Sequence, residues 1–146
     1  MKTCIKSLSI LFLFVLMAHF ASAQVLDVRI TNVHNLKGLI RVAIFDCQSN
    51  FKKEKTCWDT CFYKKALDKN EFRVRIPIQS GRFALSVLDD ENCSGKMEYN
   101  FLGIPLKGFG FSDFYLNGLS RPAFDDFCFK IAKKEIKPIL VKMKYF

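Results

Sequence analysis

Oxygen-bearing side chains alternate along one short segment in the second half of the chain, at Asp90, Asn92, Ser94 and Glu98. Calcium is a hard cation that takes about six to eight oxygen ligands from such groups. Gly95 permits a sharp turn between them, and the carbonyl of Lys96 would supply a main-chain ligand. The pattern predicts a calcium-binding loop whose ligands are Asp90, Asn92, Ser94, Lys96 and Glu98.

This loop also has a simpler interpretation. Phe101 occupies the position where such a loop usually has a bidentate glutamate. Asp, Asn, Ser and Gly also favour an Asx-type turn without any metal, through local hydrogen bonds. We therefore expect either a plain turn or a weak calcium site, with a dissociation constant of about 10⁻⁴–10⁻³ M.

Five cysteines follow residue 23, namely Cys47, Cys57, Cys61, Cys93 and Cys128. In an oxidising compartment such cysteines form disulfides, and an odd one remains free. If one antiparallel strand separates the strands that end at Asp46 and Asp89, their following loops share one end of the molecule. We then expect two disulfides among Cys47, Cys57, Cys61 and Cys93, because the spacings match neither a usual zinc site nor a redox motif.

Few residues favour catalysis. His34 is the only histidine after residue 23, and it lies in a turn. Asp89 and Asp90 are adjacent, so on a strand their carboxylates point to opposite faces and do not converge. We expect no enzyme, although a small secreted hydrolase that uses the carboxylates near Asp90 and Glu98 is the alternative.

Aromatic residues are interleaved with glycines after this loop, at Phe101, Phe109, Phe111, Phe114 and Tyr115. Aromatics on a glycine-rich loop can form a binding surface for carbohydrate or peptide. They can also fold back over the open face of a small sandwich, and both alternatives stay open at this point.

The N-terminus has the features of a cleavable signal peptide. Lys2 and Lys6 precede an apolar run at residues 8–17, and Ala21-Ser22-Ala23 provides small residues for the signal peptidase. The run is shorter than the ~20 residues that span a bilayer. We predict cleavage after residue 23, a domain over residues 24–146 that does not span a membrane, and a secreted or periplasmic location.

The net charge of that domain excludes few classes of function. It has 21 basic and 14 acidic residues, a net charge of +7. Its lysines mostly lie in short turn-like clusters, and no nucleic-acid-binding module is recognisable, so we expect no nucleic-acid partner. A monomer with an envelope or extracellular partner is expected.

Short strands separated by turn residues must position these groups. Residues 25–33, 39–46, 72–78, 82–88, 123–132 and 136–145 predict strands, and residues 54–67 predict a short helix. Pro77 indicates an edge position for the third of these strands. The pattern favours an all-β fold, a single antiparallel β-sandwich of the immunoglobulin-like or transthyretin-like class.

The segments DDENCSGKMEYNFLGIPLKGFGFS and RPAFDDFCFKI, after GLIRVAIFD and SGRFALSVLDDEN, resemble a family of exported bacterial proteins, the domain of unknown function 2141 family. The resemblance covers residues 39–145. It implies one β-sandwich domain in the bacterial envelope and no known activity. We therefore expect a binding or structural module that uses the loops at one end, with calcium as the one candidate cofactor.

Overall fold

A computed structural model of the protein describes residues 24–66 and 71–146. The predicted signal peptide, residues 1–23, lies outside the described residues. None of the described helices is long and apolar enough to cross a lipid bilayer.

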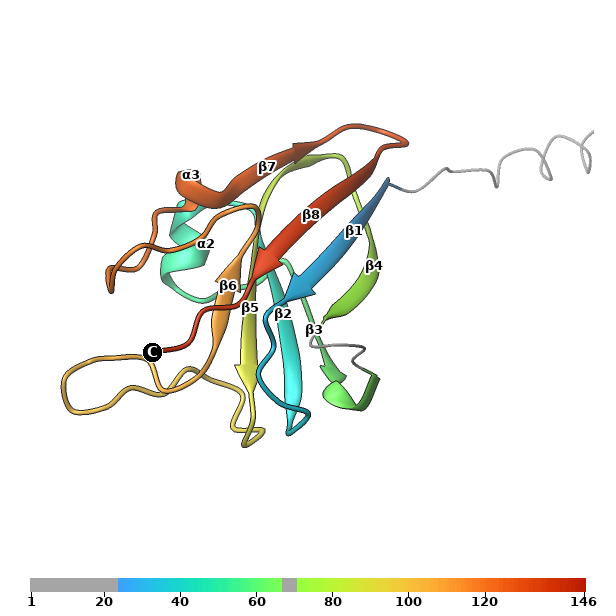
Figure 1. Ribbon diagram of the computed structural model, residues 1–146. Coiled ribbons are helices and arrows are strands. Elements are labelled where there is room, and N and C mark those ends of the chain that lie inside the picture. The colour runs from blue at the N-terminus through green and yellow to red at the C-terminus, as the bar shows by residue number, and fades with distance from the viewer. Residues whose placement is uncertain (1–23, 67–70) are drawn as a thin grey trace, which may run out of the picture.

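The described chain forms two packed β-sheets (Figure 1). The three-stranded sheet has the order β4-β1-β8, from β1 (Gln24–Thr31), β4 (Phe72–Ile78) and β8 (Ile136–Lys142). The five-stranded sheet contains β2 (Leu39–Phe45), β3 (Trp58–Tyr63), β5 (Gly81–Asp90), β6 (Phe109–Phe111) and β7 (Cys128–Ile131). Its order is β3-β2-β5-β6, and β7 pairs with the other half of β5. The helices are short: α2 (Gln48–Lys52), the 3₁₀ helix η1 (Lys64–Ala66) and α3 (Phe124–Phe127).

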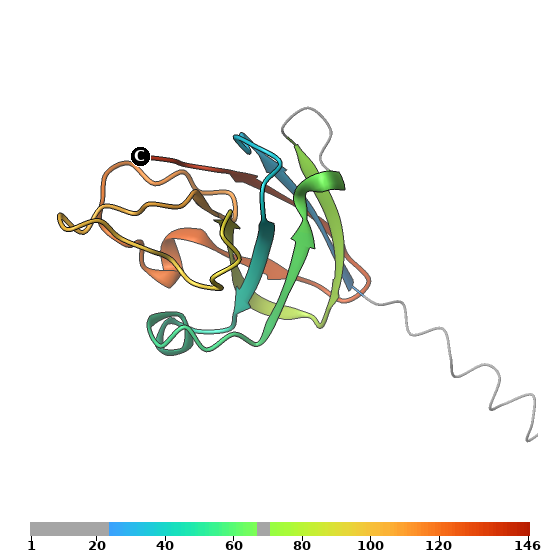
Figure 2. The same cartoon turned by 90° about the horizontal axis from the view of Figure 1, so that it is seen from below.

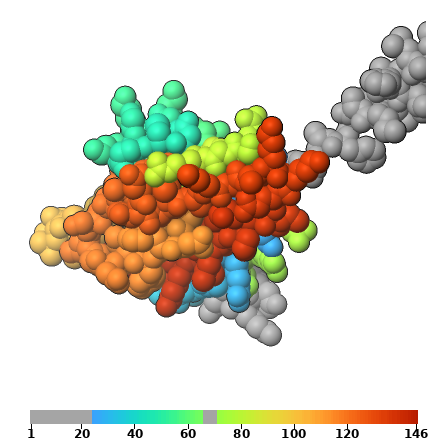
Figure 3. All heavy atoms as spheres, turned by 90° about the horizontal axis from the view of Figure 1, so that it is seen from above, coloured from blue at the N-terminus to red at the C-terminus, as the bar shows by residue number. Residues whose placement is uncertain are grey.

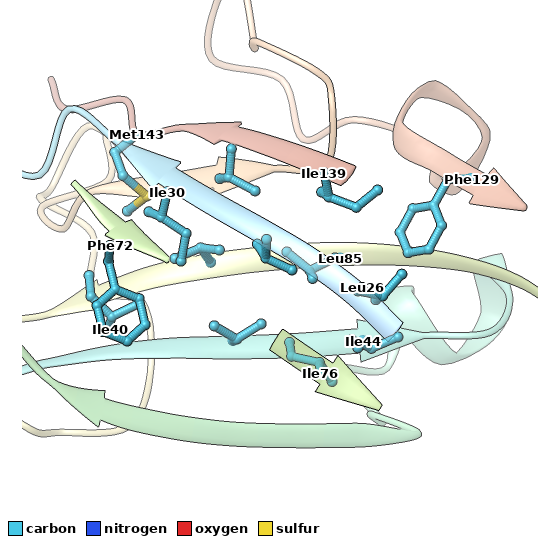
Figure 4. Packing of buried hydrophobic residues seen from close by; sticks show 14 of the residues in the cluster. Leu26, Ile30, Ile40, Ile44, Phe72, Ile76, Leu85, Phe129, Ile139 and Met143 are labelled. Atoms are coloured by element: carbon cyan, nitrogen blue, oxygen red, sulfur yellow. The ribbon is translucent and has the colours of Figure 1, made fainter. Parts of the chain in front are cut away.

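The main core lies between the two sheets (Figure 4). Side chains from alternate positions of each strand fill it, because successive residues of a strand face opposite sides. The predicted inward residues Val42, Ile44, Ile76, Leu85 and Val87 are buried there. Val74 is partly buried and packs against the same cluster. The prediction of at least six strands in two sheets is confirmed, and β4 is an edge strand as Pro77 indicated.

Three expectations about the elements were wrong. β1 pairs in parallel with β8, so the sandwich is not wholly antiparallel. Residues 58–63 form strand β3 against β2 instead of a helix, because Trp58 and Phe62 alternate with exposed residues and pack against the core. The segment predicted as a strand from residue 123 begins with helix α3.

A second apolar cluster covers the outer face of the five-stranded sheet. It consists of Phe45, Phe51, Ala84, Phe109, Phe111, Phe124 and Phe127, contributed by α2, α3, β6 and their neighbours. This explains why β2 is apolar on both sides: Val42 and Ile44 face the main core, while Ala43 and Phe45 face the second cluster.

Two glycines allow β6 to approach the C-terminal strand. A Cβ atom on Gly110 would lie 2.5 Å from a methyl of Val141, and one on Gly108 would lie 2.2 Å from the Tyr145 ring. The close approach lets Phe109 and Lys144 exchange two backbone hydrogen bonds of 3.0 and 2.7 Å. The loop after β5 therefore ends in a strand, β6, that pairs with β5 in one sheet and contacts the C-terminal segment of the other.

Candidate functional site

Two adjacent carboxylates, Asp89 and Asp90, end strand β5, and both are fully buried. They lie on opposite faces of the five-stranded sheet, as their adjacency predicted. Asp89 is on the side of the main core, and Asp90 is on the outer side. Each is paired with a buried lysine from a different part of the chain.

Asp90 is the centre of the outer ion cluster. Its Oδ1 accepts hydrogen bonds from Lys107 Nζ (2.6 Å) and the Ser94 amide (3.1 Å). Its Oδ2 accepts from Arg41 Nε (2.6 Å) and the Gly95 amide (2.8 Å). Four donors therefore satisfy a carboxylate that has no exposed surface.

Lys107 Nζ occupies the point on which the predicted calcium ligands converge. Besides Asp90 it contacts Ser94 Oγ at 2.7 Å, the Lys96 carbonyl at 2.9 Å and Glu98 Oε1 at 3.2 Å. Asn92 does not reach it, and instead donates its amide to Glu98 at 2.9 Å. Four of the five predicted ligands thus surround an ammonium group of the protein itself.

The described residues contain no cluster of three or more His, Cys, Asp or Glu side chains that could hold a metal ion. Calcium binding stays a prediction, and Lys107 Nζ would compete with the ion for these oxygens. Lys107 was missed by the sequence analysis because it lies 17 residues from Asp90 along the chain. The one available signal was a lone lysine within an otherwise apolar, glycine-rich segment.

The cluster lowers the pKa of both its carboxyls. Burial raises the pKa of Asp90, but hydrogen bonds from Lys107, Arg41 and Gly95 outweigh it and lower the value to about 2. Hydrogen bonds from Asn92, Ser94 and Lys107 lower the pKa of Glu98 to about 2. Burial lowers the pKa of Lys107, yet bonds to Asp90 and Glu98 leave it raised. The cluster therefore remains charged at neutral pH.

This arrangement predicts a loss of stability in acid. The folded-state pKa of Asp90, about 2, lies below its ordinary value of 3.8. The stabilisation is therefore present above about pH 4 and is lost as the pH falls through about 2, amounting to about 2 kcal/mol. Urea unfolding at several pH values should show that Asp90→Asn flattens this dependence. The exposed control Asp125→Asn should not, and equal slopes in both variants would contradict the assignment.

Asp89 belongs to a second, inner ion pair. Its Oδ1 pairs with Nζ of Lys64, and both side chains are fully buried. Its Oδ2 accepts a 2.7 Å hydrogen bond from the Tyr145 hydroxyl. Burial and this bond raise the pKa of Tyr145. The His34 ring stacks on the Tyr145 ring with centroids 3.6 Å apart. His34 therefore packs against the residue that donates a hydrogen bond to Asp89.

An open groove of about 470 Å³ lies over the outer face of the five-stranded sheet. Ala43 and Ser86, which are register partners, and Leu88 form its floor. Its walls come from the α2 region, from the loop between β5 and β6, and from the loop before α3. In Figure 2 these three segments lie on the same side of the five-stranded sheet. Apolar side chains dominate the lining, namely Phe45, Phe51, Met97, Phe109, Phe111 and Leu116.

The groove is flanked by charged groups at fixed places. Arg41 is held by Asp90, and the Arg121 guanidinium stacks over the Phe51 ring at 4.2 Å while donating to the Phe51 carbonyl at 2.8 Å. Glu54 and Asp59 also line the groove. An apolar floor with a few positioned polar groups is the usual form of a small-molecule site.

The five aromatics predicted as a binding surface are divided between two environments. Phe109 and Phe111 are buried in the second cluster and line the groove, and Phe114 packs beside them. Phe101 is 95% exposed and Tyr115 is 44% exposed. Three of the five aromatics therefore belong to the apolar layer on the outer face of the five-stranded sheet, and the other two are exposed to solvent.

The prediction that four cysteines gather at one end was wrong. β2 and β5 pair directly and antiparallel, with Leu39 opposite Asp90, so the loops after them lie at opposite ends. Cys47 and Cys57 lie near the C-terminal end of β2. Cys61 lies opposite Arg41 in the pairing of β3 with β2, and Cys93 follows the C-terminal end of β5, at the opposite end of the sheet. The five cysteines of the described chain are free thiols, so the expected disulfides are not present.

Two sheets that enclose a core, with loops that cover the outer face of one of them, define a β-sandwich protein. Residues 28–138 match the model of a family described as an uncharacterized protein conserved in bacteria, DUF2141, and the chain belongs to this family. The resemblance found in the sequence is thus confirmed. No curated protein and no solved structure matches the chain.

Proposed function

We propose that this protein is a non-catalytic binding module that accommodates a small, mainly apolar molecule in the groove on the outer face of the five-stranded sheet. We further propose that it acts in the bacterial periplasm or outside the cell, as a monomer, after removal of residues 1–23. The observation that carries the proposal is the groove itself. Its volume of about 470 Å³ falls within the range of ligand sites, roughly 300–1,000 Å³.

The ion cluster supports a structural role for the carboxylates near the groove. A hydrolase that used Asp90 and Glu98 would need one of them free to accept or donate a proton. Both are instead bound to Lys107, and both have a pKa of about 2. The histidine of the described chain, His34, is stacked on Tyr145. This arrangement favours a binding module over the hydrolase alternative.

A neutral apolar dye, N-phenyl-1-naphthylamine, tests the groove. We expect its fluorescence to rise when it binds the native protein. Ala43→Leu places extra atoms on the floor and should weaken binding by about tenfold or more, because filled volume excludes the ring. The matched control Ala132→Leu, in an exposed turn outside the groove lining, should bind like the native protein.

Phe101→Ser provides a second control, because this exposed residue is another place where a dye can bind. Its dye affinity should equal that of the native protein. Equal affinity of the Ala43→Leu variant and the native protein would contradict the groove as the binding site. So would the absence of any fluorescence increase with the native protein.

A further inference from the structure

A second surface feature adjoins the groove, since Tyr99 and Pro105 line both, but the inference drawn from it does not depend on the groove proposal. Residues 99–106 form a projecting turn, here called the apolar finger, whose base is a bridge between Tyr99 and Pro105. Its apolar side chains point away from the domain: Phe101 is 95% exposed, Leu102 68% and Leu106 62%. In Figure 3 the gold atoms of this part of the chain form one extreme end of the molecule.

The finger satisfies its own backbone. Asn100 Oδ1 accepts hydrogen bonds from the amides of Leu102 and Ile104, both at 2.9 Å. The Gly103 amide donates to the Asn100 carbonyl at 3.0 Å, and the Leu106 amide donates to the Glu98 carbonyl at 2.8 Å. A turn that enters hydrocarbon must satisfy its polar groups internally, because no water is there to replace the lost bonds. The finger largely meets that requirement.

The segment that contains the finger is mainly apolar and has few acidic residues. From residue 99 to residue 122 the sequence has a single acidic residue, Asp113. In Figures 1 and 2 the loop between β6 and α3 and the C-terminus lie on the same side of the molecule as the finger. These two segments have exposed apolar residues, including Tyr115, Leu119 and Phe146. The ammonium groups of Lys142 and Lys144 lie beside the rings of Tyr115 and Phe146, at 5.1 and 4.5 Å.

We propose that the apolar finger docks the protein on a lipid membrane by inserting Phe101 and Leu102 into the interface. A projecting tip fits a deformable bilayer, and apolar side chains next to lysines match acyl chains beneath anionic headgroups. Tyr115 and Phe146 would then lie at headgroup level, where amphipathic and aromatic rings are favoured.

Vesicles of phosphatidylethanolamine and phosphatidylglycerol test this docking. All variants are made in the chain that begins at Gln24, because the apolar run at residues 8–17 would itself bind vesicles and mask the contribution of the finger. In co-sedimentation, the double variant Phe101→Ser and Leu102→Ser should lose affinity by about tenfold or more. Tyr63→Ser removes a side chain that is 74% exposed on β3, and it should bind like the native protein. Equal binding of all three proteins would overturn the proposal.

Tryptophan quenching by lipids with brominated acyl chains reports insertion directly. Phe101→Trp adds an indole at the tip while the native Trp58 is kept in every protein. We expect quenching of this variant to exceed that of the native protein, and Tyr63→Trp to show no excess. If the excess is missing, or if binding disappears at high salt, insertion is wrong and the exposed finger is better explained as the docking site of another protein.

Discussion

Replacing Lys64 by methionine should lower the free energy of unfolding by about 3–5 kcal/mol, as expected when one partner of a buried ion pair is removed. Lys64 and Asp89 are both fully buried, and no solvent is available to replace the lost partner. Methionine fills a similar volume, so the loss reports mainly the unpaired charge. Urea unfolding, monitored by the fluorescence of Trp58, measures it.

The neighbouring Lys65 provides a matched control, because its side chain is exposed in the same 3₁₀ helix. Lys65→Met should change stability by no more than about 0.5 kcal/mol. Adding Asp89→Asn to Lys64→Met should recover part of the loss, since the amide carries no charge and its oxygen can still accept the Tyr145 hydrogen bond. If Lys64→Met and Lys65→Met were equally stable, the buried pair would not contribute as its geometry indicates.

The local pattern of the sequence was sufficient to predict the main core. Alternation, nearly complete in residues 72–78 and weaker in residues 82–88, identified Ile76, Leu85 and Val87 as inward residues, because a strand has only two faces. The same alternation failed to distinguish the parallel partner of β1 from an antiparallel one. Pairing direction depends on how distant strands meet, and nothing within β8 itself records it.

The candidate site was partly predictable for the same reason. Ser94, the Lys96 carbonyl and Glu98 lie close to Asp90 in sequence, so their spacing was enough to predict that they converge. The cation at their centre comes from residue 107, beyond a turn whose path no local pattern fixes. The prediction that four cysteines gather at one end was wrong because it depended on an assumed strand order. The direct pairing of β2 and β5 excludes that order.

The position of Lys107 leads to the second large prediction, which concerns calcium. Lys107→Met should lower the free energy of unfolding by about 3 kcal/mol, because among the described residues it leaves the buried Asp90 with Arg41 as its only charged partner. The variant also frees the oxygens of Ser94, Lys96 and Glu98. With two formal negative charges, these groups should bind calcium with a dissociation constant of about 10⁻⁴–10⁻³ M.

Calcium and Lys107 therefore compete for one place, and thermal melts should show it. At about ten times its dissociation constant, calcium should add about 1.4 kcal/mol to the stability of the Lys107→Met variant, raising its melting temperature by several degrees. The native protein and Lys107→Arg should not respond, because a cationic side chain already occupies the ligands. Asp90→Ala in the Lys107→Met background should abolish the response, and magnesium should give a smaller one, since it demands a stricter octahedral shell. A calcium response in the native protein that equals that of the variant would show that Lys107 leaves these oxygens when the ion arrives, and that the loop is a calcium site in its own right.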